Sequence, residues 1–393
     1  MYNFDEIIER RGTGCIKYDA LQSAFGRADL EPLWIADMDF RTPDFIVDAL
    51  KERIGHPIFG YPQVPEDYFE TISAWVQSLH GWKVRPEHIR YIPGIVKGIA
   101  FAERCFLKPG DKVVIQPPVY HPFRNTTLAC GFEVVENPML PVCDEDGFLT
   151  GYRMDFAGLE HICADPSVKM MVLANPHNPC GIAWDRATLQ AIAEITRRNG
   201  ALVVSDEIHG EMVLGGEPHH PFTAVSEDAA AGSIVFMAPS KTFNIAGIVS
   251  SYCIIEDEAI REKFFNYIAS CEVDFPPIFP MVATTAAYTK GGQWRREMLA
   301  YVEGNINFVD KWLRNNLPSI RAVRPQASFL VWLDCRKLGL DHDSLTDLFV
   351  NKARLALNDG AMFGAEGSGF MRLNVGCPRS TLERALESLK QAV

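Results

Sequence analysis

The 393-residue sequence predicts an α/β protein in which helices cover both faces of a mostly parallel, seven-stranded-type sheet, followed by a smaller α+β unit. The first observation behind this prediction is a series of continuously apolar strand patterns separated by helical ones, as expected for strands buried on both faces. The second is the length, because a chain this long usually divides into more than one unit, each with its own hydrophobic core. The third is a change of pattern after about residue 285.

The elements of the larger unit follow one another from Gly94 onward. A turn at Gly94 precedes a helix that begins near Ile95, and another helix is expected over 185–199. Asp185 suits the amino-terminal cap of that second helix and Gly200 suits its stop. Its apolar face consists of Leu189, Ile192, Ala193 and Thr196. The predicted strands cover 113–115, 170–173, 201–207, 233–240 and 249–255.

The smaller unit begins with one long amphipathic helix. The stretch "WRREMLAYVEGNINFVDKWLRNN" (294–316) has this pattern, and strands are expected within 328–335 and 370–377. Ser380 and Glu383 have the spacing of a capping box, which predicts the start of a final helix.

Composition and charge exclude several classes of function. The formal net charge is -12, from 38 basic and 50 acidic side chains, and no run of Lys and Arg is present, so a nucleic-acid partner is not expected. No apolar stretch is long enough to span a bilayer, and the charged start "MYNFDEIIERRG" is unlike a secretory signal. The ten cysteines are scattered without a C-x-x-C pair, which indicates reduced thiols, no metal site and a cytoplasmic location.

Polar side chains follow the predicted strands at the points where these strands end. Asn178 comes after the second strand, Asp206 and His209 come after the third, and Ser240 and Lys241 come after the fourth. Open parallel sheets bind their ligands at the carboxyl ends of the strands, so we expect these side chains to meet.

Further features add to this group. Lys241 stands among apolar residues, where an ammonium group is costly unless it is paired, deprotonated or chemically used. The helix start at Ile95 offers free N–H groups to a phosphate, and Tyr120 supplies a flat aromatic ring after the first strand.

Each residue alone also has an ordinary structural explanation. Gly94 could serve only the turn, Tyr120 could be a core aromatic, and Asp206 could cap a helix or pair with an arginine. His209 alone is typical of a hydrogen-bonded histidine. The pair His219–His220 lacks a carboxylate or cysteine at metal-ligand spacing, so we interpret both as loop residues.

The combination is more informative than its members. A phosphate-binding helix start, an aromatic ring, an amide, an acid and a lysine, each at a strand end, together describe a site for pyridoxal 5'-phosphate. In such a site the lysine forms a Schiff base with the aldehyde, and the acid keeps the ring nitrogen protonated so that the ring withdraws electrons.

The motifs "NPHNPCG" (175–181), "DEIH" (206–209) and "SKTFNIAG" (240–247) resemble those of the fold-type I, aspartate-aminotransferase-like family of pyridoxal phosphate enzymes. Within it, "RRGTGCIKYD" (10–19), "PLWIADMDF" (32–40) and "FGY" (59–61) are similar to the MalY/PatB-type cystathionine β-lyases. His209 and Asn244 also match that subfamily, where generic aminotransferases usually carry tyrosine and glycine.

The resemblance implies a role for each matched position. Lys241 would carry the cofactor, Asp206 would bind its ring nitrogen, and Asn178 its ring oxygen, with His209 close by. Tyr120 would stack on the ring. The phosphate would be held by Ile95, Val96, Ser240 and, from the neighbouring subunit of a homodimer, Tyr61. Arg372 would clamp the substrate carboxylate as a bidentate fork.

The resemblance also implies an arrangement of domains. An arm over 1–45, including Ile35 and Ala36, would close on the substrate and the small domain; the cofactor domain would cover 46–285 and the small domain 286–393. Val249 departs from the wider family, which often carries a phosphate-binding arginine at this position. The phosphate charge would then rest more on the helix start, Ser240 and Tyr61.

The implied reaction is α,β-elimination from cystathionine or a related S-conjugate of L-cysteine, giving a thiol such as homocysteine, pyruvate and ammonia. Transamination of an aromatic or small neutral amino acid shares the removal of the α-proton and stays an alternative. A regulatory, protein-binding role, known among proteins with this resemblance, is a second one, although the intact Lys241, Asp206 and Arg372 favour catalysis.

Overall fold

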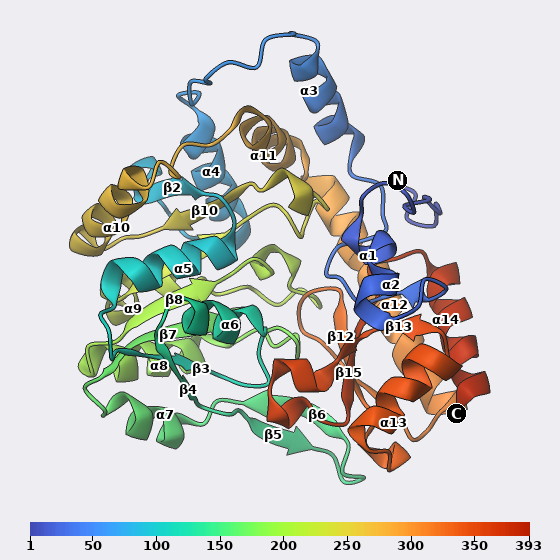
Figure 1. The fold of residues 1–393 in the computed structure, drawn as a ribbon. Helices are drawn as coiled ribbons and strands as arrows, with labels where there is room; N and C mark the ends of the chain where they lie inside the picture. Colours follow the sequence, from blue (N-terminus) through green and yellow to red (C-terminus); the bar gives the residue numbers. More distant parts are fainter.

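The computed structural model describes residues 1–393 and contains a seven-stranded mixed sheet in the order β2-β10-β9-β8-β7-β3-β4 (Figure 1). The strands from β9 to β4 run parallel, and β10 is antiparallel to both of its neighbours. The α/β prediction is therefore confirmed, and all five predicted strands are present. The bounds are β2 Ile89–Ile92, β3 Lys112–Ile115, β4 Glu133–Glu136, β7 Val168–Ala174, β8 Leu202–Asp206, β9 Ser233–Met237 and β10 Ser251–Ile254.

The central strands are largely apolar because their residues alternate between two cores. On β7, Met171 and Leu173 belong to the larger hydrophobic cluster, while Met170 and Val172 face the opposite way into a second one. Helices cover both faces, as expected for a sheet with little polar alternation. The helices of this part are α3 Asp44–Ile54, α4 Tyr68–His80, α5 Ile95–Phe106, α6 Pro122–Ala129, α7 Phe156–Cys163, α8 Arg186–Arg198, α9 Glu227–Ala231, α10 Glu258–Ser270 and α11 Ile278–Lys290.

The start and stop residues predicted for two of these helices are confirmed. α5 begins at Ile95 directly after Gly94, which has a φ of 113°. α8 is capped by the Asp185 side chain, which accepts a hydrogen bond from the N–H of Thr188, and Gly200 beyond its end has a φ of 73°. Glycine adopts that left-handed conformation without steric cost.

The C-terminal part forms a four-stranded antiparallel sheet in the order β11-β12-β15-β14. The long helix predicted over 294–316 is α12, and the strands predicted within 328–335 and 370–377 are β12 and β15. The bounds are α12 Gly292–Asn316, α13 His342–Asp347, α14 Arg379–Ala392, β11 Arg321–Val323, β12 Leu330–Asp334, β14 Asn358–Asp359 and β15 Phe370–Asn374. A separate hairpin pairs β5 Leu140–Cys143 with β6 Leu149–Arg153.

The capping box predicted at Ser380 and Glu383 is wrong. α14 starts at Arg379, two residues before the start that a cap at Ser380 implies, and its amino-terminal cap position is Pro378, which makes no side-chain capping bond. Ser380 already lies inside the first turn, so its hydroxyl cannot occupy the cap position. The extended φ of -51° and ψ of 141° at Pro378 begin the helix without a polar cap.

The amino-terminal segment packs on the C-terminal part. It contains α1 Ile16–Asp19 and α2 Leu21–Phe25, and β1 Glu31–Pro32 pairs in parallel with β13 Leu355–Ala356 (Figure 1). From β1 the chain continues as residues 33–42, which we call the strap and which runs past the end of the large sheet. None of the helices combines the length and the apolar character needed to cross a membrane.

Candidate active site

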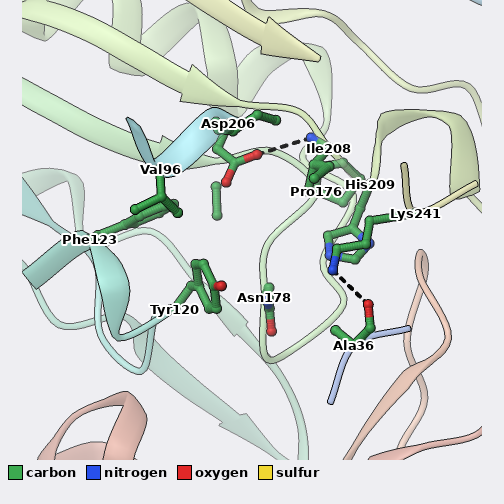
Figure 2. A pocket seen from close by; sticks show the side chains of 12 residues that line it. Ala36, Val96, Tyr120, Phe123, Pro176, Asn178, Asp206, Ile208, His209 and Lys241 are labelled. Atoms are coloured by element: carbon green, nitrogen blue, oxygen red, sulfur yellow. Dashed lines mark hydrogen bonds between the residues drawn. The ribbon is translucent and has the colours of Figure 1, made fainter. Parts of the chain in front are cut away.

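The carboxyl ends of the parallel strands border a cavity of about 120 Å³. It brings together side chains that lie far apart in the sequence, since β7 and β8 are neighbours and β9 follows β8. Figure 2 shows Asp206 and Tyr120 on one side of this cavity and Lys241 with His209 on the other. The predicted site residues that line it are Ala36, Ile95, Val96, Tyr120, Asn178, Asp206, His209 and Lys241.

Lys241 lies beyond the end of β9 and is only partly buried. It borders the small cavity and also a second one of about 740 Å³, which the strap residues line. Its amine donates a hydrogen bond to the carbonyl oxygen of Ala36 at 2.6 Å (Figure 2). Desolvation lowers the pKa of Lys241 to about 8, against the opposing effect of the nearby Asp37. At pH 7 roughly a tenth of this amine is therefore neutral, far more than for a lysine of ordinary pKa, and the neutral form is the one that acts as a nucleophile or base.

Asp206 is the last residue of β8 and is buried. Its carboxylate accepts a hydrogen bond from the N–H of Ile208 at 3.1 Å, whereas the Lys241 amine is engaged with the strap instead. Desolvation raises the pKa of Asp206 to about 7. A desolvated carboxyl that faces a cavity suits a ligand atom that carries a proton, such as a ring nitrogen.

The start of α5 has the character of an anion site. The first backbone bond in this turn is donated by Gly98 to the carbonyl of Gly94 at 2.9 Å, so the N–H groups of Ile95 and Val96 precede it and stay available. Val249 lies beside this turn, because a Cβ built on Gly94 would be 3.9 Å from its Cγ1 atom. The position at which the wider family often has arginine thus holds an apolar side chain next to the helix start.

Arg372 is a buried cation on β15 whose partners are all neutral. Its guanidinium donates to the side-chain oxygens of Asn178 at 2.9 Å and Asn358 at 2.5 Å, and to the carbonyl of Trp34 at 3.1 Å. The ring of Phe363 lies 4.9 Å away, and the Nε atom is buried without a partner. Burial lowers the pKa of Arg372 to about 10, which leaves it charged at neutral pH. A buried cation without a carboxylate is prepared for an anionic ligand.

His209 and Tyr120 complete the walls of the small cavity. Burial lowers the pKa of His209 to about 3, so the imidazole is neutral, and its Nδ1 atom is buried without a partner. The backbone N–H of Tyr120 donates to the carbonyl of Asn178 at 3.0 Å, which ties the loops after β3 and β7 together. Burial also raises the pKa of the Tyr120 hydroxyl.

Four predicted residues do not line the small cavity: Arg372, which reaches it only through its bond to Asn178, and three others. Ser240 is buried next to Lys241 at the end of the β9 loop. Ile35 belongs to the strap and borders the larger cavity with Lys241. Tyr61 is fully exposed in the loop between α3 and α4 and makes no contribution to the cavity of its own chain.

Sequence reasoning missed the polar network that holds the strap. The buried Lys17 amine lies 2.7 Å from the Asp39 carboxylate, which also contacts Arg10 at 2.6 Å, and Arg10 pairs with Asp37 at 2.9 Å. The signal was present as two acids inside the apolar stretch "PLWIADMDF" and a basic stretch at 10–17. Two acids in an apolar stretch, together with a basic stretch nearby in the sequence, could have suggested a buried ion-pair network.

A second missed pair lies behind Asp206. Glu207 is buried and contacts the Nε2 atom of His219 at 2.6 Å. His219 does lie in a loop, as interpreted from the sequence, but it is buried there rather than exposed. Glu207 also accepts bonds from Ser205 and from the backbone N–H of Phe222, so it braces the loop that carries Asp206.

The donor set fits pyridoxal 5'-phosphate part by part. An amine suits its aldehyde, a raised-pKa carboxyl suits its ring nitrogen, an amide suits its ring oxygen, and a helix start suits its phosphate. Two of the buried polar atoms without partners belong here: Nδ1 of His209, which lines the cavity, and Nε of Arg372, whose guanidinium contacts Asn178.

Comparisons with known proteins agree with this fit. The family model described as aminotransferase class I and II matches residues 29–389. The chain is 42% identical to the cystathionine beta-lyase PatB of Bacillus subtilis over 391 residues, covering 100% of both chains. Among solved structures it is similar to cystalysin from Treponema denticola, which contains pyridoxal 5'-phosphate (TM-score 0.94, 32% identity, 100% and 98% of the two chains). It is also similar to a pyridoxal phosphate-bound C–S lyase from Staphylococcus hominis (TM-score 0.90, 29% identity, 100% and 98%).

Proposed function

Because the chain belongs to the aminotransferase class I and II family, we propose that it is a pyridoxal phosphate-dependent C–S β-lyase. It cleaves cystathionine or a related S-conjugate of L-cysteine by α,β-elimination, and the products are a thiol, pyruvate and ammonia. The observation that carries this proposal is the full-length similarity to a cystathionine beta-lyase in a chain that retains the facing Lys241 and Asp206.

Residues around the small cavity would hold the cofactor. Lys241 would hold its aldehyde carbon, Asp206 its ring nitrogen and Asn178 its ring oxygen, while Tyr120 would stack on the ring with His209 close by. Its phosphate is held by Ile95, Val96, Ser240 and the partner's Tyr61. When bound, pyridoxal phosphate supplies an electron sink for negative charge at the α-carbon of an amino acid.

Side chains of this protein bind the substrate, exclude water and remove the α-proton. Arg372 binds the substrate α-carboxylate, and its bonds to Asn178 and Asn358 fix the plane of its fork. Ile35 and Ala36 of the strap cover the substrate and exclude water. The Nζ atom of Lys241 removes the α-proton, a role that its pKa of about 8 supports. The C–S bond then breaks with its electron pair on sulfur, and addition of water to the remaining unsaturated amino acid gives pyruvate and ammonia.

Assembly, domain division and location belong to the same proposal. We propose a homodimer with shared sites. Support comes from one loop that exposes three large side chains, Ile58, Phe59 and Tyr61, because such a cluster is typical of a surface that binds another protein. The proposed division is an arm over 1–45, a cofactor domain over 46–285 and a small domain over 286–393. All ten cysteines are free, which supports a reducing, cytoplasmic location.

The product assay separates elimination from transamination. Purified holoenzyme is incubated with L-cystathionine, and thiol, pyruvate and ammonia are measured together. Elimination predicts equal amounts of all three and no need for a 2-oxo acid. Transfer of amino groups from an aromatic or small neutral amino acid to a 2-oxo acid, with no thiol from cystathionine, would replace this proposal by the aminotransferase alternative.

A further inference from the structure

Asn244 connects the loop that carries Lys241 to the strap. Its side-chain oxygen accepts a hydrogen bond from the N–H of Met38 at 3.0 Å, and its side-chain nitrogen donates to the carbonyls of Met38 and Phe40, both at 2.9 Å. Its own backbone carbonyl accepts a bond from the Thr42 hydroxyl at 3.1 Å. One amide therefore fixes the strap on one side of Ala36 and stands three residues after the lysine.

Asn374, on the C-terminal sheet, holds the strap on both sides of Ala36. Its side-chain nitrogen donates to the carbonyls of Ile35 and Asp37, both at 2.7 Å. Its backbone N–H donates to the carbonyl of Leu33 at 2.9 Å. Asn374 thus holds the residues next to Ala36, Asn244 holds the strap from Met38 onward, and the carbonyl oxygen of Ala36 accepts the bond from the Lys241 amine at 2.6 Å.

The backbone of Asn244 is adapted to this contact. Its φ is 56°, in the left-handed region that asparagine tolerates better than most residues. That conformation lets one short side chain reach both polar groups of Met38. A side chain that only closed a loop would not need two donors and one acceptor aimed at the strap.

We propose that Asn244 is a positioning residue for the base. By holding the strap it keeps the Ala36 carbonyl where the free Lys241 amine rests, so that the amine stays aligned with the α-proton of the bound amino acid. This inference rests on the proposed role of Lys241 in removing that proton. A displacement of roughly 1 Å in such a pair is enough to slow a reaction by about two orders of magnitude.

The test compares two variants with a control. Asn244→Gly removes all three side-chain bonds and still allows the left-handed backbone, whereas Asn244→Asp keeps the acceptor for Met38 but loses both donors. Asn316→Gly is the control, because that amide also makes two side-chain bonds, to Trp312 and Lys390, and borders neither cavity.

Two readouts are measured on each holoenzyme. The first is amide hydrogen exchange in peptides that cover the strap. The second is the rate at which the α-proton of L-alanine exchanges with solvent deuterium, together with the dissociation constant of L-alanine from the change in cofactor absorbance. Alanine has no β-leaving group, so this rate reports proton removal whether the enzyme is a lyase or an aminotransferase.

We expect Asn244→Gly to increase strap exchange and to slow α-proton exchange about tenfold or more, with the alanine dissociation constant changed less than about threefold. Asn244→Asp should lie between it and the wild type, and Asn316→Gly should match the wild type. Normal α-proton exchange in either Asn244 variant with a loosened strap would overturn the inference. So would an equal loss in the control, or strap exchange that does not change.

The result is separable from the proposed function. A wild type that exchanges the α-proton but releases no thiol from cystathionine contradicts the lyase proposal and leaves the role of Asn244 standing. If Asn244→Gly does not fold, the inference is decided by Asn244→Asp, which retains part of the contact.

Discussion

Replacement of Arg372 by lysine should weaken the handling of substrate strongly while the protein stays folded. Arg372 presents a planar fork whose orientation is set by Asn178, Asn358 and the carbonyl of Trp34. A lysine ammonium cannot reproduce two parallel bonds to a carboxylate, and it cannot satisfy all of these neighbours at once.

The magnitude follows from the bonds that are lost. Losing one charge-assisted hydrogen bond to a desolvated carboxylate costs about 2 to 4 kcal/mol, which corresponds to roughly a 30- to 1000-fold fall in kcat/KM. Because Arg372 also donates to Asn178, a small change in the absorbance of the bound cofactor should accompany the loss. The cofactor content should stay complete.

The assay is the rate of thiol release from cystathionine at several concentrations, with Arg336→Lys as the matched control. Arg336 lies on the same part of the fold, pairs with Asp334 at 2.7 Å and covers the ring of Phe370, but its side chain is 40% exposed and donates only to Asp334 and Gly147, not to Asn178 or the strap. The control should keep wild-type kcat/KM. Near-normal kcat/KM in Arg372→Lys would show that Arg372 does not bind the substrate carboxylate, and the carboxylate site would then have to lie elsewhere.

Three further predictions concern the cofactor. Mixing Tyr61→Phe and Lys241→Ala proteins should restore activity in heterodimers, because one of their two sites then has both residues intact; inactive, verified heterodimers would contradict a shared site. Val249→Arg should lower the dissociation constant of the cofactor about tenfold by adding a cation beside Gly94, measured by release on gel filtration, and an unchanged constant would count against a phosphate at the start of α5. Burial raises the pKa of Asp206 to about 7, so the folded state favours the neutral carboxyl. The free energy of unfolding that this shift contributes is fully present near pH 4 and is lost as the pH rises through 7. Cofactor-free Asp206→Asn should therefore gain stability over the wild type between pH 4 and pH 8, on the order of 2 to 4 kcal/mol in urea unfolding, and an equal difference at both pH values would exclude a desolvated Asp206.

The sheet and the residues at its strand ends could be predicted because local patterns determine them. Asp206 ends an apolar strand and Asn178 lies in the loop that follows another, and parallel neighbours place such residues at one edge. Lys241 was expected to be buried because its sequence neighbours are apolar. It is only partly buried, since the strap leaves a large cavity on its other side, and no local pattern describes a cavity.

The contacts of the strap could not be predicted, because they join residues that are distant in the sequence. Asn244 is 206 residues from Met38, and Asn374 is 339 residues from Ile35. Each is a short polar side chain with ordinary neighbours, so only the packing of the two parts of the fold reveals its partner. The prediction of a capping box at Ser380 failed for the opposite reason: the local pattern matches, but it lies two residues after the position where the helix is capped.

The most direct test of the account asks which amine carries the cofactor. The holoenzyme is reduced with borohydride, digested, and its peptides are mapped by mass spectrometry. We expect the cofactor on the peptide that contains Lys241, whose amine borders both cavities and has its pKa lowered by burial. A label on Lys17, which is paired with Asp39, or on the exposed Lys97 would contradict it.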